Sequence, residues 1–532
     1  MSDSGVVAAP GPSVWRRLPW ILAIALLPVL FAGFRLRPVD DAFISLRYAQ
    51  SWAEHHHHGW NPDDHVEGYT NFLWTALLAL GWSRDHILAI LRGLGMVSFL
   101  AALVLMDRFV CAAVGPRAAW LATILLAGNW SVVAPVGFGL ETPLVLALLA
   151  WLLSASGRAL EGQASAEWEA SLAAALGILT RLDFVLLAAP LLAVVLWRRR
   201  TVRSAVALAV PLLLVVGSWL VWKFATYHTL LPATAAAKLS APGGMRYTRW
   251  LQGISYLIAY LLLYGVGALA LFGLRKPSLR RDLVVGMLGA AAAWSLYIVL
   301  AGGDWIEFRL AAPLAFLLVP LGAAALAAED RKWSGAAVAA SVAVSAWLAL
   351  EFGVAISLSF GQDRRAMQRD SLLWSEIGRG LHRAFPAGMW GGSTVRIATT
   401  AAGAVPYYAE LWTFDLVGLN TPEVSRAGVP HLSMPGHARH ATVAQTEAAG
   451  VHLVLGRPEA VERDHWADET ARQCHVAPRY FRAGGEGHET DRIRVVGVPL
   501  DGGRVAPMWY LRPSGEVDAA LASGTLIALP CP

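Results

Sequence analysis

The sequence predicts a polytopic α-helical membrane protein that ends in a soluble α/β domain, and three observations support this fold class. Hydrophobic residues make up 56% of the 532 positions and charged residues only 15%, which is too apolar for a soluble chain of this length. Apolar runs of membrane-spanning length recur over the first 360 residues. Beyond them, charged residues, Pro, Gly and His become frequent and no run reaches that length.

The apolar runs predict about 11–13 transmembrane helices. Residues 71–82 are too short to cross a bilayer alone, and residues 171–197 are long enough for two short helices. The runs cover residues 19–36, 71–82, 87–106, 118–136, 142–156, 171–197, 203–222, 251–273, 283–301, 308–328 and 335–358.

The basic residues give the orientation of the chain in the membrane. The formal net charge is +5, but the Lys and Arg residues form short clusters between apolar runs instead of a patch that would bind nucleic acid. Such clusters mark cytoplasmic loops, and they occur at residues 15–17, 198–200, 275–281 and 331–332. We therefore expect residues 224–250, 302–307 and everything after 360 on the periplasmic side of the inner (plasma) membrane.

We divide the chain into a membrane domain, residues 1–360, and a soluble periplasmic α/β domain, residues 361–532. Within the second domain, the segments VRIAT (395–399) and VHLVLG (451–456) alternate with polar turns, as strands do. Cys474 and Cys531 both lie in this domain. In an oxidising compartment they either form a disulfide or remain two thiols.

The first outer loop, residues 37–70, carries an acidic pair, Asp40 and Asp41. The segment that follows has helical spacing with Arg47 on its polar side, so we expect a helix lying flat in the membrane interface and the pair facing water. Two neighbouring like charges raise one pKa, which suits a proton acceptor. Capping of a helix is the alternative for Asp41, but a cap needs only one aspartate. The pair also suits a divalent cation such as Mg, Mn or Ca.

Further ionisable residues are expected at the ends of the membrane helices. Such groups are costly there unless they are paired or functional. The basic ones suit a lipid-linked phosphate and the acidic ones suit sugar hydroxyls or a metal, whereas singly each basic residue also fits a snorkelling surface group. They are Glu141 in GLETP, Arg181 and Asp183 in LTRLDF, Lys238 in LLPATAAAKLS, and Asp304, Glu307 and Arg309 in AGGDWIEFRLAAP.

A histidine run lies in the same outer loop. His55 to His58 stand near Asp63, Asp64 and His65, and these residue types ligate transition metals. A solvated loop explains them better than a metal site, and we expect the loop.

The loop VDDAFISLRYAQSW…GWNPDDHVEGYTNFLW, followed by GLETP, LTRLD, LLPATAAAKLS, GGDWIEFRLAAP and AGAVPYYAELWTFDLVGLNT, resembles the GT-C glycosyltransferases related to the mycobacterial terminal β-(1→2)-arabinofuranosyltransferase. The resemblance runs in order from about residue 14 to 460. It implies the GT-C fold, a periplasmic active centre at the acidic pair, a polyprenyl-phosphate sugar donor such as decaprenyl-phosphoryl arabinofuranose, and a lipid cavity between helices. It also implies that the C-terminal domain helps to bind a glycan acceptor.

Two motifs depart from that family. Its members commonly read GHG-FNPGE-VEG where this chain has HHHHGWNPDDHVEG, and TRPD where this chain has TRLD. These differences bear on the choice of acceptor.

Together, the residues and the resemblance predict an enzyme that transfers a sugar from a polyprenyl phosphate to a cell-envelope glycan or lipid-linked acceptor. Asp40 or Asp41 would accept the proton of the acceptor hydroxyl, and Arg309, Lys238 and Arg181 would hold the leaving phosphate. The sequence calls for no particular cofactor, and metal dependence stays open because the acidic pair fits catalysis with or without a divalent cation. The residues expected to bind sugar or acceptor are Arg47, Glu67, Tyr69, Asn71, Glu141, Asp183 and Asp304.

A transporter or flippase of lipid-linked sugars is the alternative. Such proteins carry charges at the membrane midplane and paired broken helices, and the sequence predicts neither. A purely structural scaffold would leave the acidic pair unexplained.

Overall fold

The computed structural model describes residues 14–234, 243–275, 279–329, 331–350, 364–430, 439–462 and 494–529. Lys238, Cys474 and Cys531 therefore lie outside the described residues. The chain divides into two compact units that interleave in sequence. The first comprises Met1–Leu36, Leu91–Trp219 and Leu251–Ser359, and the second comprises Arg37–Ile90, Leu220–Trp250 and Phe360–Pro532. The first outer loop thus belongs to the same unit as the C-terminal domain.

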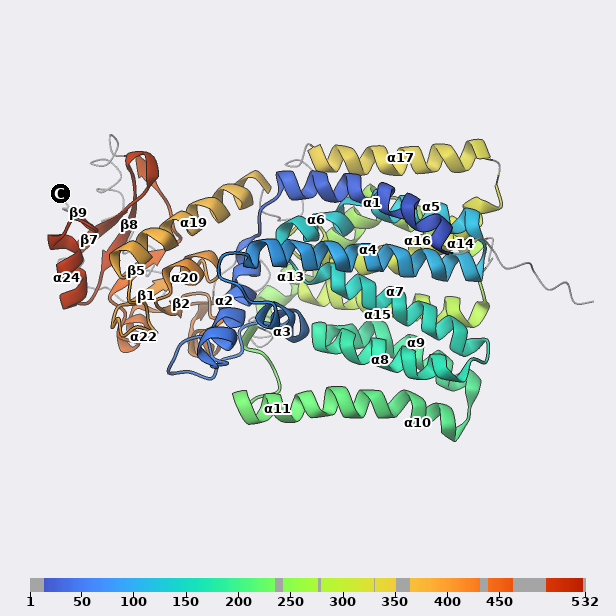
Figure 1. Ribbon diagram of the computed structural model, residues 1–532, viewed down its shortest axis with the longest axis horizontal. Coiled ribbons are helices and arrows are strands. Elements are labelled where there is room, and N and C mark those ends of the chain that lie inside the picture. Colours follow the sequence, from blue (N-terminus) through green and yellow to red (C-terminus); the bar gives the residue numbers. More distant parts are fainter. Residues whose placement is uncertain are drawn as a thin grey trace, which may run out of the picture. The chain divides into compact units, whose positions relative to one another are not determined.

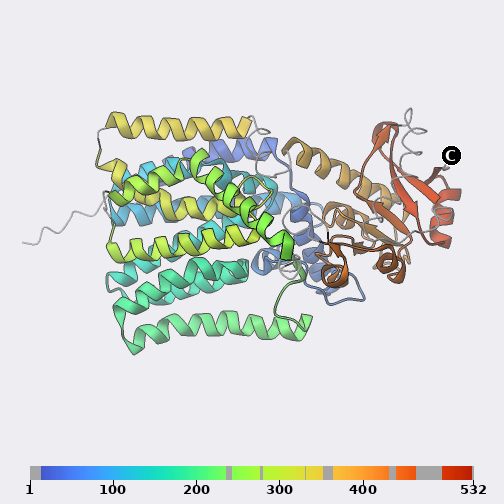
Figure 2. The same ribbon diagram turned by 180° about the vertical axis from the view of Figure 1, so that it is seen from behind.

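The first unit is a bundle of apolar helices that run side by side (Figures 1 and 2). Helix α16 is buried on all sides along nearly its whole length, as expected for a helix without a polar face. The helices are α1 (Val14–Arg35), α4 (Ile87–Ala113), α5 (Pro116–Ala127), α6 (Trp130–Phe138), α7 (Thr142–Leu160), α8 (Ala164–Thr180), α9 (Val185–Arg199), α10 (Val202–Pro211), α13 (Gly243–Leu263), α14 (Val266–Arg275), α15 (Arg281–Ala301), α16 (Ala312–Ala327) and α17 (Arg331–Leu350).

Five helices among the described residues are long and apolar enough to cross a membrane, or up to seven when each of two bent pairs counts as one span. This confirms the helical membrane class, while the total of 11–13 spans stays a prediction. Several expected spans are shorter than the hydrocarbon core requires. The stretch 171–197, for example, divides at Arg181 into the end of α8 and α9.

Two spans are broken inside the bundle. Helices α5 and α6 meet at 51°, and α13 and α14 meet at 69°. The chain turns between α13 and α14 at Gly265, whose φ of +64° favours glycine. The sequence did not predict these two bent helix pairs.

The second unit contains a mixed sheet with the strand order β2-β1-β5-β8-β7-β9, and β6 pairs with β8. Strands β2, β1 and β5 are parallel, and the remaining pairs are antiparallel. The predicted strands at VRIAT and VHLVLG are confirmed as β1 and β5. The strands are β1 (Arg396–Thr399), β2 (Trp412–Asp415), β5 (Leu453–Gly456), β6 (Val461–Glu462), β7 (Arg494–Pro499), β8 (Arg504–Tyr510) and β9 (Ile527–Leu529), with β3 (Val429–Pro430) and β4 (Arg439–His440) forming a separate pair.

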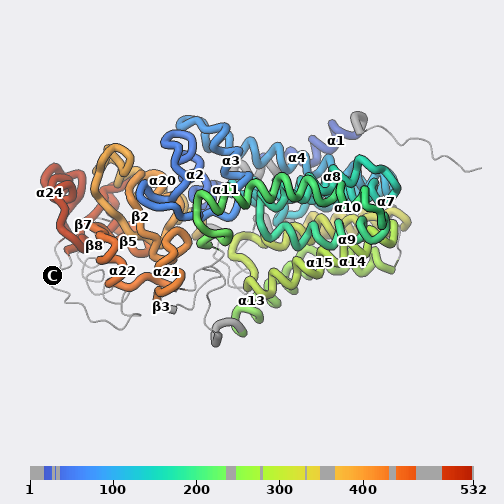
Figure 3. The backbone as a smooth tube through the Cα atoms, turned by 90° about the horizontal axis from the view of Figure 1, so that it is seen from below, coloured from blue at the N-terminus to red at the C-terminus, as the bar shows by residue number. Residues whose placement is uncertain are grey.

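Helices cover both faces of this sheet (Figure 3). One apolar core joins α19 (Arg364–Ala384), α20 (Ala404–Ala409) and α24 (Gly515–Ala522) to the strands. The other joins α21 (Pro422–Ala427) and α22 (Val443–Ala448) to the opposite face. The C-terminal region is therefore a layered α/β structure, as predicted from its composition.

Helix α2 (Asp40–His55), which carries the acidic pair, packs within this second unit together with α3 (Phe72–Leu80) and the end of α11 (Ser218–Tyr227). All residues from Ala42 to Ser51 are buried. The expectation that the polar side of α2 faces water is therefore wrong, whereas the expectation that α2 lies flat in the membrane interface stays a prediction. Its polar side meets polar backbone groups of residues 403–411, and periodicity alone does not separate such a surface from solvent.

Candidate active site

The acidic pair forms the first turn of α2, directly after the N-cap residue Val39. Neither aspartate caps α2. The two carboxylate oxygens of Asp40 instead accept hydrogen bonds from the backbone N–H groups of Gly403 (2.9 Å) and Ala404 (2.7 Å) at the start of α20. Asp40 and Asp41 are both half-buried. The pair is thus partly accessible, and one of its members has a fixed orientation.

The electrostatics of Asp40 suit a proton acceptor. The pKa of its carboxyl is raised to about 7, mainly by burial and also by the neighbouring charge of Asp41, while the two backbone N–H groups oppose the shift. The predicted rise of one pKa in the pair is confirmed, although burial and not the like charge is its largest cause. A group with a pKa near ambient pH is well placed for general base catalysis.

One face of α2 packs against residues 403–411. Positions 40, 43, 47, 50 and 54 share this face because residues three or four apart lie together on a helix. Phe43 packs on the rings of Tyr407 and Tyr408, with ring centroids 5.5 and 5.4 Å away. Gln50 donates to Glu410 (2.9 Å). Figure 1 shows α2 next to α20.

Arg47, expected to bind sugar, lies at the centre of this contact. Its guanidinium is buried and donates to the carbonyl oxygens of Pro406 (2.7 Å) and Leu411 (3.0 Å) and to Asn61 Oδ1 (3.2 Å). Burial lowers its pKa to about 10, so it remains charged at neutral pH. In this structure Arg47 therefore connects α2 to residues 61, 406 and 411 of the same unit.

The VEGYTN loop holds three more of the expected sugar ligands, Glu67, Tyr69 and Asn71, and all three are buried. Glu67 pairs with Lys223 of α11 at 2.7 Å, and both side chains are at most 2% exposed. The hydroxyls of Tyr69 and Tyr227 lie 3.0 Å apart. Burial raises the pKa of Glu67 to about 7 even though Lys223 opposes the shift. Sequence reasoning did not assign Lys223 a role.

The third of these residues, Asn71, forms hydrogen bonds to side chains of the neighbouring helices α2 and α3. Its side chain exchanges hydrogen bonds with Ser45 (3.0 and 3.2 Å) and accepts one from Thr75 (3.1 Å). Gly68, between Glu67 and Tyr69, lies so close to Asn420 that a Cβ there would stand 1.7 Å from Asn420 Oδ1. The loop is therefore fixed between α2, α11 and residue 420.

A second polar cluster lies in the first unit. Arg181, at the end of α8, binds Asp183 with two hydrogen bonds (3.0 and 2.6 Å) and Glu141 with one (2.7 Å). Arg309 binds Asp304 at 2.6 Å. Burial alone would raise the pKa of Glu141, but Arg181 and Arg309 outweigh it and hold the pKa below its usual value. The structure thus brings these five predicted residues into one charge network.

Glu307 lies beside this network and is buried. Its carboxylate accepts a hydrogen bond from the indole of Trp130 (3.2 Å). Glu307 and Phe308 both adopt left-handed backbone conformations, with φ of +45° and +58°. Two consecutive non-glycine residues with left-handed backbone conformations store backbone strain, and such strain is often found at functional sites.

Among the described ranges, no group of three or more His, Cys, Asp or Glu side chains is arranged to hold a metal ion. Asp64, from the histidine-rich loop, is occupied by the backbone N–H groups of Trp60 (2.7 Å), Asn61 (3.0 Å) and Val66 (3.2 Å). A cation at Asp40 and Asp41 stays a prediction.

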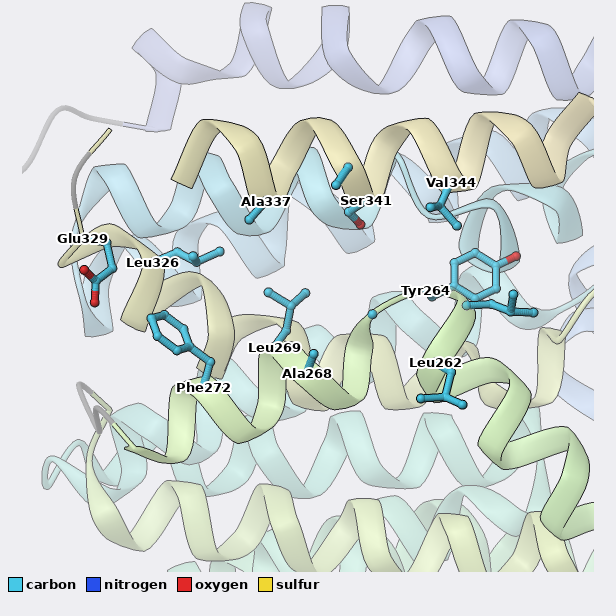
Figure 4. Close-up of a pocket in the computed structure, with 13 residues that line it drawn as sticks. Leu262, Tyr264, Ala268, Leu269, Phe272, Leu326, Glu329, Ala337, Ser341 and Val344 are labelled. Atoms are coloured by element: carbon cyan, nitrogen blue, oxygen red, sulfur yellow. The ribbon is translucent and has the colours of Figure 1, made fainter. Parts of the chain in front are cut away.

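The first unit also contains an apolar cavity of about 620 Å³. It lies between the bent pair α13–α14, the end of α16, and α17 (Figure 4). Figure 4 shows the Glu329 carboxylate at one end and Tyr264 toward the other. The wall between them is formed mainly by Leu, Ala, Phe and Val side chains, which suits a hydrocarbon chain.

The chain is similar to a domain family and to several known proteins. A domain of unknown function (DUF8728) matches residues 362–493. Over 338 residues the chain is 25% identical to the terminal β-(1→2)-arabinofuranosyltransferase of Mycobacterium tuberculosis, an alignment that covers 55% of this chain and 53% of that protein. The chain therefore spans about half the length of this curated relative.

Solved structures match over a longer stretch. The crystal structure of ArnT from Cupriavidus metallidurans bound to undecaprenyl phosphate aligns with a TM-score of 0.59 at 12% identity, covering 93% of this chain and 98% of that one. Its apo state aligns with the same TM-score at 11% identity. The chain is therefore a multi-pass membrane protein with the fold of the GT-C glycosyltransferases. The resemblance seen in its motifs is confirmed at the level of the fold.

Proposed function

We propose that the protein transfers a sugar, arabinofuranose by its resemblance, from a polyprenyl phosphate to a cell-envelope acceptor on the periplasmic face of the membrane. The observation that carries this proposal is the acidic pair, in which Asp40 is oriented by two backbone N–H groups and has a pKa of about 7. Two relatives support it, because one is an arabinofuranosyltransferase and the other was crystallised with undecaprenyl phosphate.

In this reaction the bond between the sugar's anomeric carbon and the phosphate oxygen breaks, and the acceptor oxygen bonds to the same carbon. Asp40 takes the proton of the acceptor hydroxyl, since its pKa lies near neutral pH. Asp41 orients the sugar. If a divalent cation is bound, the carboxylates of Asp40 and Asp41 would hold it, and it would neutralise charge on the leaving group.

The polyprenyl phosphate leaves as an anion and needs positive charge nearby. Arg181 and Arg309 supply it in the proposal, together with Lys238. Both arginines are held by carboxylates, so Glu141, Asp183 and Asp304 act mainly by fixing the guanidinium groups. The apolar cavity beside α17 supports a lipid-linked substrate because its lining is compatible with an isoprenoid chain.

The direct test incubates purified protein with a panel of radiolabelled polyprenyl-phosphate sugars and a cell-envelope glycan acceptor. Decaprenyl-phosphoryl arabinofuranose is expected to give labelled glycan at the highest rate. If only a donor that carries mannose or another pentose gives labelled glycan, the transferred sugar is that one and not arabinofuranose. Absence of transfer from every donor would overturn the proposed activity.

Transport of lipid-linked sugars remains a second candidate because of the two broken spans, a feature of many transporters. Proteoliposomes loaded with a fluorescent polyprenyl-phosphate sugar separate the two functions. Movement of the label between leaflets without an acceptor would favour a flippase, whereas transfer that needs acceptor favours the enzyme.

A further inference from the structure

The C-terminal domain holds the chain on both sides of the acidic pair. Before the pair, the Ser371 hydroxyl of α19 donates to the carbonyl of Pro38 (2.6 Å), and Gln368 accepts from the N–H of Arg37 (2.7 Å). After it, residues 403–411 contact Phe43 and Arg47, as described above. The domain therefore fixes the backbone from residue 37 through the second turn of α2.

At the pair itself the contact is closest. The N–H groups of Gly403 and Ala404 each bond one oxygen of the Asp40 carboxylate, which sets both the position and the rotation of that group. A Cβ on Gly403 would stand 1.9 Å from the carbonyl oxygen of Asp40 and 2.6 Å from its carbonyl carbon. Only glycine at position 403 allows this approach without a backbone shift.

We propose that the Gly403–Ala404 segment positions the catalytic carboxylate, so that the C-terminal domain contributes to the chemical step as well as to acceptor binding. This inference rests on the proposed transferase function. A base is effective when a third group orients it, and misplacement of a reacting group by about 1 Å costs on the order of 10²-fold in rate. A domain that only captured acceptor would affect the acceptor KM instead.

Two substitutions in the C-terminal domain change the contact between Asp40 and residues 403–404 without altering either aspartate. Gly403→Ala forces the two segments apart. Ala404→Pro removes a single donor N–H at the first helical position of α20, where proline is well tolerated. Gly515→Ala is the matched control, because an added Cβ there meets no atom within 4 Å and the residue also begins a helix of the same domain.

The experiment measures kcat, the KM of donor and acceptor, and amide hydrogen exchange at residues 403–404. We expect Gly403→Ala and Ala404→Pro to lower kcat on the order of 10²-fold, with both KM values within about twofold of wild type and Gly515→Ala unchanged. A rise in acceptor KM with kcat retained in both variants would overturn the positioning role.

Hydrogen exchange tests the contact independently of activity. Asp40→Ala should speed exchange of the Gly403 and Ala404 amides by at least about tenfold relative to Asp41→Ala, because these two N–H groups donate to the Asp40 carboxylate. Equal exchange in the two variants would contradict the inference even if transfer is observed. If wild type transfers no sugar but exchange follows the expected pattern, the proposed function fails while the contact stands.

Discussion

The two polar clusters of this protein balance charge in different ways. In the first unit, three carboxylates (Glu141, Asp183 and Asp304) face two guanidinium groups (Arg181 and Arg309), so each cation is matched by an anion. In the second unit, the Asp40 carboxylate accepts hydrogen bonds from neutral backbone N–H groups, and the charge with the largest effect on its pKa is that of Asp41. The first arrangement fixes arginines, whereas the second keeps negative charge available for a proton or a cation.

The largest expected effect on stability lies in the first cluster. Arg181→Leu leaves the buried Glu141 and the half-buried Asp183 without their cation, which should cost about 3–5 kcal/mol of unfolding free energy. The half-exposed pair Arg158–Glu169 in the same unit provides the control, since Arg158→Leu should cost no more than about 1 kcal/mol. Thermal unfolding of the detergent-solubilised variants measures both. Equal midpoints for the two variants would show that Arg181 is not held structurally.

The buried pair Glu67–Lys223 should behave as one unit. Glu67→Gln or Lys223→Met alone strands a buried charge and should cost about 3–5 kcal/mol. The double variant removes both charges, so its loss should be smaller than the sum of the single losses. Unfolding midpoints of the four proteins form the cycle. Strict additivity would mean that the two side chains do not depend on each other.

The pH dependence of transfer sharpens the role of Asp40. A general base acts only when deprotonated, so kcat/KM should fall as pH drops below about 7, the pKa that burial and Asp41 give Asp40. Asp41→Asn removes one of the causes of that rise and should move the acidic limb to lower pH. A limb that stays in place in this variant would assign the titration to another group.

The smallest expected effect concerns the apolar cavity. Ala337→Phe fills part of its wall and should raise the Kd of undecaprenyl phosphate about tenfold, which corresponds to about 1.4 kcal/mol. Ala339→Phe, an exposed position on the same helix that does not line the cavity, should leave the Kd unchanged. Equal Kd values for the two variants would show that undecaprenyl phosphate does not bind in this cavity.

The sequence predicted the helical bundle and the strands at β1 and β5 because their periodicities are local properties. It also located the acidic pair at the start of a helix. It missed what faces that helix, because amphipathic spacing shows which side is polar but not whether water or protein covers it. The partner groups, Gly403 and Ala404, lie more than 360 positions away in the chain.

Two further features escaped the sequence reasoning for related reasons. Lys223 lies in an apolar run, and only the fold brings it to Glu67. The rarity of lysine in this arginine-rich chain was the one available signal. The left-handed backbone at Glu307 and Phe308 has no sequence signature, since neither residue type favours it.

The most direct test of the account compares wild type with the Asp40→Asn/Asp41→Asn double variant in a single-turnover assay with bound radiolabelled decaprenyl-phosphoryl arabinofuranose. We expect the variant to bind donor with an affinity close to wild type but to transfer sugar at least about 10²-fold more slowly. Transfer at the wild-type rate would contradict the assignment of the chemistry to the acidic pair.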